Sequence, residues 1–117
     1  MTAKEYLQDI QANAVQLREL KNFKAHTTGD NSRVNARIKS IEGELSTGVK
    51  LIESLQNPIY RALLLMRYFN GYSISKTAET LQYSTRWVLT LQRRAIAELE
   101  QIAGEKIEHY HSDGKGA

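Results

Sequence analysis

Two short helical patterns joined by a turn of fixed length constrain the fold of this chain most strongly, and they occupy residues 72–99. The first pattern begins at Ser73 and the second at Ser84, and serine is a good N-cap residue in both places. Apolar residues follow each cap at helical spacing, which predicts a helix-turn-helix. They are Ile74, Ala78 and Leu81 in the first helix and Val88, Leu91, Ala95 and Leu99 in the second.

The second predicted helix has two distinct faces. At 100° per residue, Ser84 and the apolar residues from Val88 to Leu99 fall within about 80° of one another. This side can pack on the rest of the domain, while the other can be offered to the major groove of DNA, which is wide enough to admit a helix. The opposite face carries Arg86, Leu89, Thr90 and Arg93.

Three neighbouring residues complete the predicted contact surface. Thr85 lies at the helix N-terminus, where free N–H groups and the helix dipole suit a phosphate. Arg94 either reaches a phosphate or braces Glu79 or Glu98. Trp87 flanks the apolar stripe, and we interpret it as a buttress between this helix and the first helix of the domain, with contact to the DNA backbone or bases as the alternative.

The same residues resemble region four of bacterial sigma factors, which recognises the promoter −35 element. The resemblance covers roughly residues 57–100, and the opening MTAKEYLQ with its helical N-terminal half is similar to ArpU-type late transcription regulators and their relatives, which are small phage-encoded proteins. It implies a phage or prophage regulator of transcription. It rests on Ser84, Val88, Leu91, the triplet Arg94-Ala95-Ile96, Leu99 and the preceding segment LLLMRYFNGYSISKTAETLQ.

Several positions depart from the sigma pattern. Lys76 and Thr77 stand where relatives usually carry an acidic residue and an isoleucine, and relatives often have a glycine at Gln82 or at Tyr83. Leu89 stands where a polar residue is usual, and three roles are open for it: contact with a thymine methyl group, a protein interface, or simple exposure. The departures leave the predicted fold unchanged.

The N-terminal half, residues 1–56, predicts an antiparallel helical hairpin with coiled-coil-like packing. One helix spans residues 3–25, the segment HTTGDNS supplies turn residues, and a second helix runs from Ser32 or Arg33 to Leu55. Its apolar seam either mediates oligomerisation or partner docking, or merely packs on the first helix. Gly48 stands at a seam position, which indicates a close helix approach or a local weakness. The seam residues are Val34, Ile38, Ile41, Leu45, Gly48, Ile52 and Leu55.

Residues 57–103 predict a trihelical DNA-binding domain whose first helix is central. Asn57 is its N-cap and Pro58 takes the first helical position, where a missing N–H costs nothing. The helix is apolar nearly all round as far as about Asn70, and Gly71 ends it in the left-handed conformation. Residues 104–117 contain three glycines and little periodicity, so we expect a flexible tail.

Composition limits the function classes. Lys and Arg number eight in residues 1–56, six in residues 57–100 and two in residues 101–117, against seven, three and three Asp and Glu. The positive excess of the chain therefore lies in the predicted DNA-binding segment. Cysteine is absent, and no apolar run reaches the roughly 18–20 residues of a membrane span. No export signal is visible either, so we expect a cytoplasmic protein that is not membrane-bound.

No pattern of catalytic residues is recognisable. The sequence has no glycine-rich phosphate loop and no Ser-His-Asp order, so we expect neither an enzyme nor a cofactor. His109 and His111 lack the further ligands that a metal site needs.

We conclude from the sequence that the chain is an all-α, sequence-specific DNA-binding regulator of transcription. It is expected to act as a homodimer, because one short recognition helix reads few base pairs of double-stranded DNA. The alternative is a protein-interaction module in which the sigma-like domain binds host RNA polymerase or another host protein.

Overall fold

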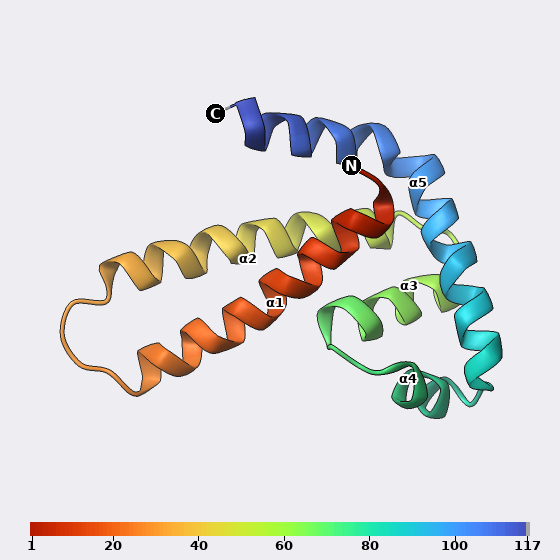
Figure 1. Cartoon of the computed structure of the whole chain (residues 1–117), viewed down its shortest axis with the longest axis horizontal. Helices are drawn as coiled ribbons and strands as arrows, with labels where there is room; N and C mark the ends of the chain where they lie inside the picture. The colour runs from red at the N-terminus through yellow and green to blue at the C-terminus, as the bar shows by residue number, and fades with distance from the viewer. Residues whose placement is uncertain (117) are drawn as a thin grey trace.

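The computed structural model describes the backbone of residues 1–116 and the side chains of residues 1–105 and 107. All regular structure within this range is helical, which confirms the predicted all-α class (Figure 1). The elements are α1 (Ala3–Ala25), α2 (Ser32–Glu53), α3 (Pro58–Leu64), the π-helix η1 (Leu65–Phe69), α4 (Ile74–Leu81) and α5 (Thr85–Gly116).

Local capping explains where most of these helices begin. Thr2 and Glu5 form a capping box at the start of α1. The N-caps predicted for α3, α4 and α5 are confirmed, since each side-chain oxygen accepts a backbone N–H two or three residues further on. Asn57, Ser73 and Ser84 accept the N–H groups of Ile59, Lys76 and Trp87 at 2.9, 3.0 and 3.1 Å.

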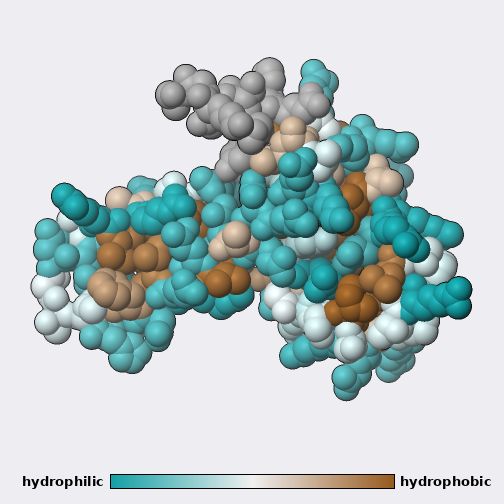
Figure 2. All heavy atoms as spheres, viewed as in Figure 1, coloured by the Kyte–Doolittle hydropathy of each residue, from teal (hydrophilic) through white to brown (hydrophobic). Residues whose placement is uncertain are grey.

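Helices α1 and α2 lie side by side and extend away from the other helices, with their connecting loop at the far left of Figure 1. The predicted seam of α2 is buried or half-buried within this chain, where it packs on α1. Figure 2 shows apolar residues along the junction of the two helices, between hydrophilic margins. Polar contacts at these margins join Asn13 to Glu44 at 2.7 Å, Gln16 to Arg37 at 2.9 Å and Lys21 to Glu42 at 3.3 Å.

Gly48 marks a close approach of three elements. A Cβ atom at this position would lie 2.7 Å from Ile10 Cδ1 and 3.2 Å from Phe69 Cζ. Of the two readings that the sequence allows for Gly48, close helix approach is therefore the one found.

The central helix predicted for residues 57–70 is formed, but its last turn is wider than an α-helical turn. Residues 65–69 form a π-helix, and the Asn70 N–H donates to the Leu65 carbonyl at 3.0 Å. Within this wide turn Arg67 bonds to α5 while Phe69 reaches Gly48. The segment ends at Gly71 with φ of 72°, which is the predicted left-handed glycine.

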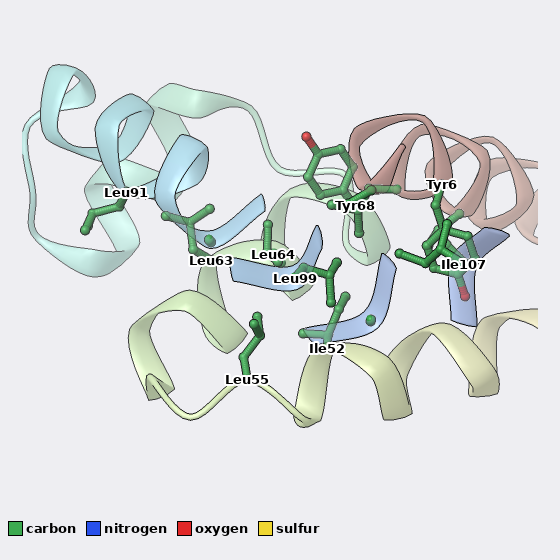
Figure 3. Close-up of a cluster of buried hydrophobic side chains, with 14 of the residues drawn as sticks. Tyr6, Ile52, Leu55, Leu63, Leu64, Tyr68, Leu91, Leu99 and Ile107 are labelled. Atoms are coloured by element: carbon green, nitrogen blue, oxygen red, sulfur yellow. The ribbon is translucent and has the colours of Figure 1, made fainter. Parts of the chain in front are cut away.

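One hydrophobic core connects all of these elements (Figure 3). Its members come from α1 and α2 as well as from α3, η1, α4 and α5, so the predicted boundary at residue 57 does not divide the core. Burial raises the pKa of the Tyr68 hydroxyl within this cluster, because desolvation disfavours the charged phenolate. The largest buried side chains include Tyr6, Ile52, Leu55, Leu63, Leu64, Leu99 and Ile107.

Helix α5 continues past residue 103, where the sequence indicates the end of the folded domain. Ala103 and Ile107 are both buried, and Ile107 has no exposed surface. Packing therefore extends at least to Ile107, because the apolar spacing from Leu99 through Ala103 keeps one side of the helix on the core. Flexibility of the remaining tail stays a prediction, since the side chains of residues 108–117, with His109 and His111 among them, lie outside the described part.

Candidate nucleic-acid interface

Helices α4 and α5 are joined by a tight turn that starts at Gln82. This residue is left-handed, with φ of 61°, and it is the one non-glycine residue of positive φ in the described backbone. The Tyr83 N–H donates to the Ala78 carbonyl at 2.9 Å, and Ser84 then caps α5. Glycine is the residue that adopts this conformation at least cost, so a side chain at Gln82 strains the turn.

The apolar stripe of α5 holds the helix against the core. Val88, Leu91, Ala95 and Leu99 are all buried, as the spacing predicts. Helix α4 packs across them through Ala78 and Thr77, and Thr77 is fully buried with its hydroxyl donating to the Ser73 carbonyl at 2.9 Å. The orientation of α5 is therefore fixed by its own buried face.

The opposite face of α5 is open to solvent. Thr85, Arg86, Leu89 and Arg93 are exposed, whereas Thr90 is half-buried and its hydroxyl donates to the Arg86 carbonyl at 3.3 Å. Neither Arg86 nor Arg93 forms an ion pair with any residue whose side chain is described. No acidic residue lies in the first turn of α5, so this surface carries uncompensated positive charge. Leu89, with 44% of its surface exposed, interrupts that charge.

Trp87 and Arg94 form a pair on the same surface. The guanidinium carbon of Arg94 lies 5.3 Å from the centre of the Trp87 ring, a cation–π distance. Trp87 is 40% exposed and does not belong to the core cluster, so its role as a buttress against α3 stays a prediction. Within the described side chains Arg94 forms no ion pair with Glu79 or Glu98, and the aromatic ring holds it instead.

One residue that positions this surface is not among those predicted from the sequence. Arg67 Nε donates to Gln92 Oε1 at 2.9 Å, and its Nη1 donates to the Tyr72 carbonyl at 2.5 Å. These bonds join η1, the segment before α4, and α5. An arginine inside the apolar run of residues 62–69 is the signal that could have identified it, because a charge at such a place needs partners.

The described residues offer little sign of other chemistry. No three His, Cys, Asp or Glu side chains among them converge as metal ligands would. None of the helices in the same range combines the length and the apolar character needed to cross a membrane. Comparison with family models, with curated proteins and with solved structures finds no match to this chain. The function is therefore inferred from the geometry of this surface.

Proposed function

We propose that the chain is a DNA-binding regulator of transcription in which α3, α4 and α5 form a trihelical helix-turn-helix domain. We also propose that this domain is related to sigma region four and that the chain is encoded by a phage or prophage. Both statements rest on the sequence resemblance. A helix that buries one side and exposes the other supports a role in reading DNA, and we propose no enzymatic activity for the chain.

One observation carries this proposal: the first turns of α5 combine a buried apolar stripe with an exposed face that holds Arg86 and Arg93 without acidic partners. Arginine is the side chain best suited to a guanine edge or a phosphate, because its planar fork donates two hydrogen bonds. Thr85 stands at the N-terminus of α5, where backbone N–H groups favour a phosphate. Thr90 and Arg94 complete the proposed contact set.

The proposal is tested by binding to mixed duplex DNA at low and moderate salt. Arg86→Ala or Arg93→Ala is expected to weaken binding by about 1–3 kcal/mol with little change in thermal stability. Lys4→Ala serves as the control, since Lys4 is an exposed cation on α1. Equal affinities of the three variants, or wild-type binding that does not change with salt, would refute the assignment.

The second candidate is a protein-interaction module that binds host RNA polymerase or another host protein. Its support is the apolar exposure on this same end of the molecule, where Tyr83, Trp87 and Leu89 each expose more than a third of their surface. Aromatic and aliphatic anchors of this kind are typical of protein interfaces. A double variant, Trp87→Ala with Leu89→Ala, is expected to abolish polymerase binding under this hypothesis while leaving the salt dependence of DNA binding intact.

A homodimer remains part of the proposal, but the seam of α2 cannot supply its interface while α1 covers that seam. The dimer has to use another surface. Light scattering at tens of micromolar gives the mass directly, and a monomeric mass would remove the dimer from the proposal.

A further inference from the structure

Charge is divided unevenly along the α1–α2 pair. The distal half, residues 20–40, contains five Lys or Arg and a single acidic residue, Asp30. The proximal parts, residues 1–19 and 41–56, contain three Lys or Arg and six acidic residues. The near balance of charge in residues 1–56 therefore conceals a positive distal end, here called the basic tip. Its cations are Lys21, Lys24, Arg33, Arg37 and Lys39.

Most of the positive charge at the basic tip is available to a partner. All five cations are exposed. Lys21 is paired with Glu42 and Arg37 is bonded to Gln16, but Lys24, Arg33 and Lys39 have no ion pair within the described part of the chain. Asp30 is occupied in the loop, where its carboxylate accepts the Ser32 N–H at 2.9 Å.

The basic tip and the start of α5 lie at opposite ends of the molecule. Figure 1 shows the α1–α2 loop at one end of the long axis and the first turn of α5 at the other. That axis measures 49 Å, and at 3.4 Å per base pair it corresponds to about 14 base pairs of duplex. Two exposed basic surfaces this far apart match a partner that carries regularly spaced negative charge over the same length.

We propose that the basic tip binds the phosphate backbone of the same DNA duplex that α5 contacts, outside the site that α5 reads. This inference rests on the proposed function. Contact with phosphates requires free cations and no shaped pocket, and these are the features present at the tip. Lys24, Arg33 and Lys39 are the principal contact residues.

A second copy of the chain fits the same end less well. Val15 and Phe23 are the large apolar side chains exposed on the described α1–α2 pair, and each offers on the order of 100 Å². A stable interface buries about 800 Å² per partner, and homodimer interfaces are mainly apolar. The exposed apolar area is too small, whereas the unpaired charge needs no such area.

The test compares two variants that lose the same charge from the same pair of helices. Lys24→Gln with Lys39→Gln removes two cations from the basic tip, and Lys4→Gln with Lys50→Gln removes two exposed lysines from the proximal end. Affinity is measured by fluorescence anisotropy on a mixed-sequence duplex of about 30 base pairs across a salt series, where each phosphate contact contributes about 0.9 to the slope of log K against log salt. The tip variant is expected to lower the magnitude of the slope by about 1–2, and the proximal variant to leave it unchanged.

A duplex of about 8 base pairs, roughly 27 Å long, provides a second readout, since it cannot reach both surfaces. The two variants are expected to bind it equally, and a difference that persists there would overturn the shared-duplex geometry. Equal slopes for the two variants on the long duplex would overturn the inference alone and favour a protein partner for the tip, provided that Arg86→Ala still reduces the slope. Wild-type protein that binds no duplex would overturn the proposed function together with the inference.

Discussion

Ile107 provides the sharpest test of how far the folded structure extends along α5. Ile107 has no exposed surface, whereas Ile102 on the same helix exposes 48% of its own. Replacing each by alanine removes the same three carbon atoms from the same helix. Helix propensity favours alanine by the same few tenths of a kcal/mol at both positions. The difference in stability between the two variants therefore reports the packing of the isoleucine side chains alone.

The expected magnitudes differ clearly. Three buried carbons at about 0.8 kcal/mol each give about 2.4 kcal/mol for Ile107→Ala, and the cavity left behind raises the loss to about 2.5–4.5 kcal/mol. At Ile102 about half of the transfer energy is already absent and no cavity forms, which leaves about 1.2 kcal/mol. The higher helix propensity of alanine lowers the net loss to below about 1 kcal/mol. At about 4 °C per kcal/mol, the melting temperature falls by about 10–18 °C in one variant and less than about 4 °C in the other.

Urea unfolding followed by far-UV circular dichroism measures both free energies, and an unchanged m-value confirms that the folded state keeps its compactness. Losses that agree within about 0.5 kcal/mol would show that α5 is not packed beyond Ala103. In that case the boundary at residue 103 that the sequence indicates would be correct.

Three further predictions concern local geometry and use the same unfolding assay. Gln82→Gly is expected to stabilise the protein by about 0.5–1 kcal/mol, because glycine adopts the left-handed conformation without steric cost, and a lower free energy of unfolding would contradict the strain at this turn. Gly48→Ala is expected to lower the free energy of unfolding by about 1–2 kcal/mol, because the new Cβ meets Ile10. Gly43→Ala on the same helix is the control: its Cβ meets nothing within 4 Å, so we expect the free energy of unfolding to rise by up to about 1 kcal/mol. Equal effects of the two substitutions would refute the close approach at Gly48. Ser84→Ala is expected to cost about 1 kcal/mol through the lost N-cap of α5, and no change would show that the cap is dispensable.

Local rules account for the part of the fold that the sequence predicts well. The caps at Asn57, Ser73 and Ser84 depend on hydrogen bonds within three residues, and the left-handed Gly71 depends on its own backbone. The buried stripe of α5 follows from a helical period that any helix on a core must satisfy. For the candidate site the same period places Arg86, Leu89 and Arg93 on the exposed side of α5, while Thr90 of the same predicted face is half-buried.

Long-range packing accounts for what sequence reasoning missed. No local signal predicts the π-turn at residues 65–69. Its residues Arg67 and Phe69 contact partners in α5 and α2, which are distant in the sequence. The core that α1 shares with α5 joins residues about a hundred positions apart, which no periodicity reveals. The helical period places Trp87 beside the apolar stripe of α5, but it does not specify that the ring pairs with Arg94.

The core shared by α1 and α5 also sets the order in which the molecule can form during synthesis. Tyr6 and Leu7 leave the ribosome before Leu99 and Ile107, their partners in the same cluster. At about 5–20 residues per second the delay is roughly 5–20 s. During this time the apolar face of α1 can pack on α2 and later on η1, but not on α5. Contacts of such long sequence separation also slow folding, because the chain must close a long loop before they form. We therefore expect nascent chains that end before α5 to remain incompletely folded and prone to association, and the surface of α5 to be presented only once the whole core has closed.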